Sequence, residues 1–174
     1  EKIHRFRMVL GDIVNKDAVE NKPLDLLNEN ITIEAAFKLN RVAQEAVNFL
    51  RQEKVMAKTL EPNFCHAKCY LFNPSEDDDR DKYFISGSSN LTEAGIGLKL
   101  TSNAELNIAE TGNNNQYKEL ANWFESLWNK PQAHLEKTLI DVNGKQTKIN
   151  FKDYLIGEIE RIFIKYTPKD IYYK

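Results

Sequence analysis

Residues 64–72 read Phe-Cys-His-Ala-Lys-Cys-Tyr-Leu-Phe and are followed by Asn-Pro. This aromatic and apolar run with a breaker at its end predicts a β-strand. Side chains alternate along a strand, so His66, Lys68 and Tyr70 are expected on one face and the intervening residues on the other. The second face is apolar and predicts core packing. The first presents an imidazole and an ammonium whose α-carbons lie about 6–7 Å apart.

A second strand is predicted at residues 82–85, and it leads into Gly-Ser-Ser-Asn at 87–90. Ser88 and Asn90 are two residues apart and share a direction if the extended chain continues. Two adjacent strands would then present them, with His66 and Lys68, to one phosphate. Histidine is a nucleophile near neutral pH, lysine is a fixed cation, and serine and asparagine are short hydrogen-bond donors. The four residues predict a phosphodiesterase site that needs no metal and no cofactor.

Each half of this pattern also has an ordinary structural explanation. A lone histidine on a strand is usually structural, and Gly-Ser-Ser-Asn is common in turns. The combination in one chain of this length is expected by chance roughly once in a thousand or more chains, given average residue usage. We therefore favour the functional interpretation of the pair of motifs.

His66-x-Lys68 followed by Gly87-Ser88-x-Asn90 resembles the catalytic signature of the phospholipase D (PLD) superfamily. The runs GSSNLTEAG at 87–95 and NAELN at 103–107 are similar to one branch of it. That branch contains metal-independent restriction endonucleases and PLD-like domains attached to bacterial helicases. The resemblance implies an α/β fold, with a mixed β-sheet flanked by α-helices. One position departs: five residues after the lysine, the family usually has Asp and this chain has Asn73. In the family, that Asp supports the fold more than the chemistry.

The resemblance also implies a mechanism. His66 would attack phosphorus to give a phosphohistidine, and a second histidine would protonate the leaving oxygen. Lys68, Ser88 and Asn90 would hold the non-bridging oxygens and stabilise their charge. Glu105 would accept a hydrogen bond from a histidine ring and fix its tautomer. The alternative for Glu105 is a solvated surface carboxylate, which is common.

Such a site needs two His-Lys sets, and this chain contains one. We therefore expect a homodimer with the active site on its two-fold axis. His4 and His134 do not supply the second set, since neither has a lysine with Ser and Asn nearby. A second set in a part of the protein outside this chain is the other explanation.

Size and charge limit the class of protein. With 174 residues, 41% of them hydrophobic, the chain can form one domain spanning residues 1–174. A net charge of −2 argues against a broadly basic surface. DNA or another nucleic acid would therefore bind in a local groove around Lys68. No apolar stretch is long enough to span a membrane and no signal peptide opens the chain, so we expect a cytoplasmic protein without a membrane partner. The missing initiator Met, and a linker-like tail at about 166–174, predict excision from a longer helicase-type protein.

The remaining pattern predicts alternating strands and helices. Cys65 and Cys69 would lie about 13 Å apart on one strand face, too far for a disulfide, and are expected to be buried free thiols without zinc. The acidic run at 76–81 predicts a solvated loop. Asn143-Gly144 predicts a type I′ hairpin turn. Thr32 is the expected cap of the first helix. The predicted strands are 5–14, 54–60, 105–109, 138–142 and 145–149, and the predicted helices are 32–53, 116–128 and 151–166.

These observations predict a metal-independent phosphodiesterase, the nuclease-like domain of a DNA helicase or defence protein. The main alternative is a catalytically silent domain that uses Lys68, Ser88 and Asn90 only to bind a DNA backbone or a partner. A phospholipid-hydrolysing enzyme is a third alternative. It is disfavoured because no amphipathic basic helix with an aromatic face is found to dock the chain on a membrane.

Overall fold

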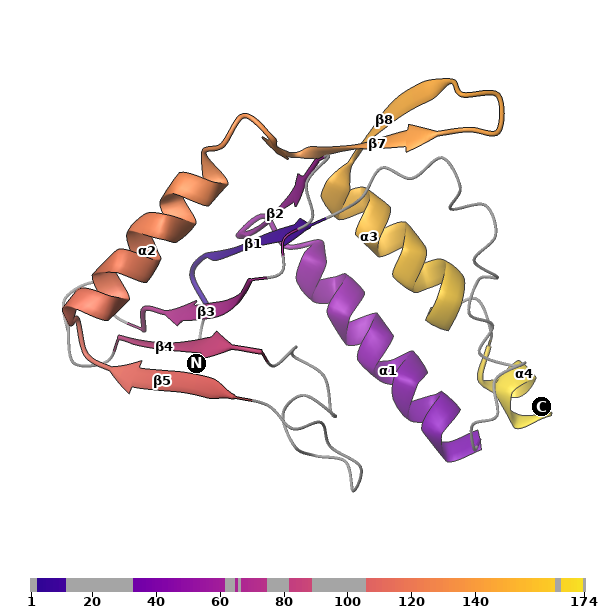
Figure 1. Ribbon diagram of the computed structural model, residues 1–174. Helices are drawn as coiled ribbons and strands as arrows, with labels where there is room; N and C mark the ends of the chain where they lie inside the picture. Colours follow the sequence, from indigo (N-terminus) through magenta and orange to yellow (C-terminus); the bar gives the residue numbers. More distant parts are fainter. Residues whose placement is uncertain are drawn as a thin grey trace. The chain divides into compact units, whose positions relative to one another are not determined.

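The computed structural model describes residues 3–11, 33–61, 65, 67–74, 82–88, 106–164 and 167–173. The described chain combines β-sheets, one of them mixed, with helices, which confirms the predicted α/β class (Figure 1). It divides into two compact units. The central unit is Cys65–Lys130, and the terminal unit is Glu1–Phe64 together with Pro131–Lys174.

The central unit contains an antiparallel three-stranded sheet in the order β3-β4-β5. Figure 1 shows these three strands side by side. Phe72 pairs with Tyr83 at one end of the β3–β4 ladder, and Lys68 pairs with Gly87 at the other. All of β5 is exposed, whereas Phe84 of β4 is only 3% exposed. The strands are β3 (Lys68–Phe72), β4 (Tyr83–Gly87) and β5 (Asn107–Thr111).

Helix α2 (Asn115–Trp128) completes the central unit and agrees closely with its predicted range. Asn114 is its N-cap, and the side-chain oxygen of Asn114 accepts a hydrogen bond of 2.8 Å from the backbone N–H of Tyr117. The helix buries Tyr117, Leu127 and Trp128. These buried side chains make one side of the helix part of the core.

The terminal unit contains a mixed sheet in the order β1-β2-β6. Strand β1 (Phe6–Gly11) runs parallel to β2 (Val55–Leu60), and β6 (Ala133–His134) is antiparallel to β2. Helix α1 (Ile33–Leu50) and helix α3 (Phe151–Ile159) supply the rest of its core. A cluster of buried apolar side chains joins these elements: Val47, Leu50, Val55 and Ile156.

The terminal unit also holds the hairpin of β7 (Glu136–Ile140) and β8 (Gln146–Asn150). The predicted type I′ turn is wrong, because that turn needs a positive φ at two successive residues and only Gly144, at φ 78°, has one there. The N–H of Asp141 donates to the carbonyl of Lys145 at 3.0 Å, which leaves a three-residue loop. The Asp141 carboxylate accepts N–H bonds from Asn143 and Lys145. This local bonding favours an ordinary turn followed by a left-handed glycine.

The C-terminal segment is more ordered than a linker. Helix α3 continues as a π-helix (Glu160–Ile164), and α4 (Pro168–Tyr172) follows and packs against α1. Thr167 and Asp170 form a reciprocal capping box at the start of α4. Ile171 is 0% exposed. Most of the segment that the sequence suggests as a linker, 166–174, is therefore a capped and packed helix.

Other element boundaries also differ from the sequence-based ranges. The strand predicted at 64–72 begins at Lys68, and the strand predicted at 105–109 lies at Asn107–Thr111. Thr32 and the acidic run at 76–81 lie outside the described residues. None of the described helices has the length and apolar character needed to cross a membrane.

Candidate active site

The two motif halves meet at one end of the central sheet. Lys68 opens β3, and it pairs directly with Gly87, which closes β4. Directly opposed residues in an antiparallel pair have α-carbons about 4.5–5.5 Å apart. Ser88 is the next residue after Gly87, so Lys68 and Ser88 belong to the same end of the ladder. We call this the lysine end of the sheet.

Strand β5 brings a third segment to the lysine end. The N–H of Ser88 donates to the carbonyl of Leu106 at 3.1 Å, and the N–H of Leu106 donates to the Ser88 hydroxyl at 3.0 Å. The Ser88 hydroxyl also lies 3.5 Å from the Leu106 carbonyl oxygen, a long contact for a hydroxyl donor. Ser88 thus fixes the residue that follows Glu105 in the chain.

Position 87 requires a glycine, and the set of predicted catalytic residues did not include it. A Cβ built on Gly87 would meet the carbonyl oxygen of Leu106 and both the side chain and the α-carbon of Asn107. Two of those three contacts are with backbone, which cannot move aside as a side-chain tip can. The absence of a Cβ therefore lets β5 approach β4 and bond to Ser88. In the sequence, the sign of this requirement is the glycine directly before Ser88.

Three of the five predicted catalytic residues, His66, Asn90 and Glu105, lie outside the described residues. Lys68 and Ser88 are described, and both are at the lysine end. His66 is two residues before Lys68 and Asn90 is two residues after Ser88. The roles of all five residues remain predictions.

The two faces of the central sheet differ. Alternation puts Lys68, Tyr70 and Phe72 on one face, with Cys69 on the other. Burial raises the pKa of the Cys69 thiol, which disfavours its thiolate. Both Cys65 and Cys69 are free and only partly buried, so the expected full burial is not observed. In the described part of the chain, no three His, Cys, Asp or Glu side chains gather as a metal site.

Asn73 lies past the opposite end of the same ladder. The last β3–β4 pair is Phe72 with Tyr83, and Asn73 follows it at an exposed position. Five residues of strand separate it from Lys68 by about 17 Å. Asn73 is therefore too far from Lys68 to contact the same phosphate.

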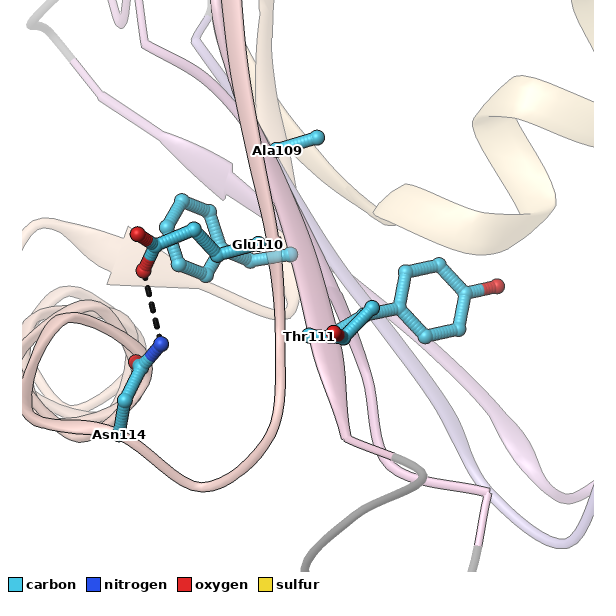
Figure 2. A pocket seen from close by; sticks show the side chains of 6 residues that line it. Ala109, Glu110, Thr111 and Asn114 are labelled. Carbon is cyan, nitrogen blue, oxygen red and sulfur yellow. Dashed lines mark hydrogen bonds between the residues drawn. The ribbon is translucent and has the colours of Figure 1, made fainter.

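A shallow hollow of about 430 Å³ is lined by parts of β4, β5 and the start of α2 (Figure 2). Figure 2 shows Glu110 directed toward Asn114, whose amide donates to the Glu110 carboxylate at 2.7 Å. Ala109 and Thr111 project to the other side of the strand. The hollow contains neither Lys68 nor Ser88, and it is thus distinct from the lysine end.

Comparison with known families gives a match over much of the chain. The model of the family described as "Cardiolipin synthase, PLD-like domain" matches residues 20–128. The match covers more than half of the chain and includes all five predicted catalytic residues. No curated protein and no solved structure matches the chain.

Proposed function

Because the chain belongs to the PLD-like domain family, we propose that it hydrolyses phosphodiester bonds of nucleic acid without a metal ion. Members of this family generally hydrolyse phosphodiester bonds, and the choice of nucleic acid as the substrate is our proposal. We further propose that the chain is the nuclease-like part of a DNA helicase or defence protein. The observation that supports the chemistry best is the pairing of Lys68 with Gly87, which brings Lys68 and Ser88 to the same end of the ladder.

The proposed reaction has two displacement steps. A ring nitrogen of His66 attacks phosphorus, the bond to the leaving oxygen breaks, and a second histidine gives that oxygen a proton. Water then attacks the phosphohistidine and loses a proton to the second histidine, and His66 is released. Lys68 and Asn90 stabilise the charge that builds on the non-bridging oxygens.

Ser88 has a further part in this proposal. Its hydroxyl accepts the Leu106 N–H at 3.0 Å, and this bond holds the hydroxyl oxygen at the lysine end. A hydroxyl is also a donor, and in this proposal it donates to a phosphoryl oxygen of the substrate. The same bond to Leu106 holds the chain next to Glu105, whose carboxylate would orient a histidine ring.

The second histidine would come from a second copy of the chain. In a homodimer of this kind, His66 from each copy faces one shared phosphate on the two-fold axis. One copy acts as nucleophile and the other as general acid. A mixed dimer with a single intact His66 would lack one of these roles.

A silent nucleic-acid-binding module is the second candidate function. Asn73 in place of the usual Asp and a single His-Lys set favour it. It would use the same Lys68 and Ser88 to hold a backbone phosphate without cleaving it. The two functions differ in the expected effect of His66→Ala. The enzyme would lose cleavage, whereas the silent module has no cleavage to lose and would keep its binding of DNA.

The deciding experiment measures cleavage of single-stranded DNA and of a small activated phosphodiester in excess chelator. The parent protein is compared with His66→Ala and Lys68→Ala, and with His4→Ala and Lys130→Ala as matched controls away from the motif. We expect each motif variant to lose at least about a thousandfold in rate, because residues of one catalytic unit act together. The controls should match the parent. Cleavage that needs a metal, or that survives His66→Ala, would reject the mechanism; no cleavage with intact DNA binding would favour the silent module.

The dimer is tested by mixing subunits. Parent protein is unfolded and refolded with a tenfold excess of His66→Ala, and the remaining activity per parent chain is measured. A shared site predicts a loss of most of the activity, because nearly every parent chain then pairs with a defective partner. An equal excess of His4→Ala should leave the activity unchanged. Retention of full activity in the His66→Ala mixture would show that each chain works alone.

A further inference from the structure

Two aromatic rings stack at the end of the central sheet opposite the lysine end. Phe72 and Tyr83 are cross-strand partners, with ring centroids 4.2 Å apart and planes 9° from parallel. They remain 38% and 36% exposed. Large aromatic side chains usually bury their rings, so an exposed parallel pair on a sheet is a notable surface feature.

The stacked pair lies on the sheet face that carries Lys68. Lys68, Tyr70 and Phe72 alternate onto one face of β3, and the ladder puts Tyr83 beside Phe72. Tyr83 in turn pairs with Thr111 of β5, which Figure 2 shows on the side of the strand away from Glu110 and Asn114. A cation and an aromatic platform therefore share one surface, about 13 Å apart along β3.

We propose that this face binds single-stranded nucleic acid, with a phosphate at Lys68 and a base stacked on Phe72 and Tyr83. Proteins that bind single strands combine cations for the backbone with aromatic rings for the bases. Bases paired inside a duplex are stacked on each other and do not offer a free face to such a platform. This inference rests on the proposed function at Lys68 and adds the strand type and a specific base subsite.

Anisotropy of a labelled oligonucleotide tests the base subsite. In excess chelator, the Kd of His66→Ala protein, which cannot cleave by the proposed mechanism, is measured for a single-stranded DNA and for the same backbone without bases. Stacking of one base predicts a Kd about 5- to 150-fold lower for the base-carrying strand. Adding Tyr83→Leu should remove most of this difference, whereas Tyr83→Phe should keep it. Tyr173→Leu, at another exposed ring, is the matched control and should also keep it.

The outcomes separate this inference from the proposed function. Equal binding of both strands, or a base preference that survives Tyr83→Leu, would overturn the aromatic subsite. If Tyr83→Leu does not fold, Phe72→Leu gives the same test, because it removes the other ring of the stacked pair. Preference for anionic phospholipid vesicles over both strands would also overturn it. The chemistry itself is judged on the small activated phosphodiester, which has no base, so its failure is distinct from failure of the base subsite.

Discussion

The terminal and central units differ in what they bury. The terminal unit encloses Val47, Leu50 and Val55 between helices and a sheet, and even its last helix hides Ile171. Among the described residues of the central unit, few side chains outside α2 are buried, and strand β5 is exposed along its whole length. The site candidates Lys68 and Ser88 belong to this sparsely buried unit. The contrast suggests that changes in the terminal unit alter stability, and that changes in the central sheet alter activity.

The strongest test of this contrast is Gly87→Ala at the lysine end. The new Cβ would collide with Leu106 and Asn107, so β5 must shift and the bonds between Ser88 and Leu106 must change. A displacement of about 1 Å in a catalytic group can cost about a hundredfold in rate. We expect kcat/KM on the activated phosphodiester to fall at least about a hundredfold. An active Gly87→Ala protein would show that the β4–β5 approach is irrelevant to catalysis.

The terminal unit should respond in the opposite way to loss of its buried contacts. Ile171→Ala removes a fully buried side chain from α4 and should lower the free energy of unfolding by about 2–5 kcal/mol. Urea denaturation measures this loss, and kcat/KM below the transition should match that of the parent. Tyr172→Ala is the control, since Tyr172 is 65% exposed and should change stability by less than about 0.5 kcal/mol. A negligible effect of Ile171→Ala would mean that α4 is a linker after all.

At a second glycine, Gly157, replacement by alanine is expected to be favourable, in contrast to the damage expected at Gly87. Gly157 lies inside α3, and a Cβ built there meets no atom within 4 Å. Gly157→Ala should therefore stabilise the protein by about 1 kcal/mol and raise the Tm by roughly 2–4 °C. Gly144→Ala is the matched control with the opposite sign, because Gly144 has φ 78° and a Cβ there costs about 1–2 kcal/mol. A lower Tm for Gly157→Ala would contradict the helical environment.

Local patterns predicted part of this fold well. The structure places α2 within one residue of its predicted range, 116–128. The opening of the motif strand at Lys68 was not predictable, because it depends on where the pairing with β4 ends. The shift of β5 has the same cause: its register is set by β4, and the N–H of Gly112 reaches the carbonyl of Lys82. Such long-range pairing leaves no periodic trace in a single strand.

Other differences had a signal in the sequence or came from tertiary contacts. The capping box of Thr167 and Asp170 is a local pattern that marks α4. The π-helix after Ile159, in contrast, has a tertiary contact that no local pattern shows. The side-chain amide of Asn40, in α1, donates to the backbone carbonyl of Phe163 at 2.7 Å, and the two residues are 123 positions apart in the sequence. For the site, the residue types predicted the chemistry, but the requirement for glycine at Gly87 became visible only with β5 in place.

The smallest effect is expected at Asn73, where the chain departs from the family pattern. Asn73→Asp adds a charge at an exposed position about 17 Å from Lys68 along the strand. In water the interaction of two unit charges at that distance is about 0.2 kcal/mol, and salt reduces it further. We therefore expect kcat/KM to change by less than about twofold, measured beside Lys68→Ala on the same phosphodiester. A gain of tenfold or more would show that the far end of the ladder controls the lysine end. Recovery of activity in an otherwise inactive protein would identify Asn73 as the reason for its silence.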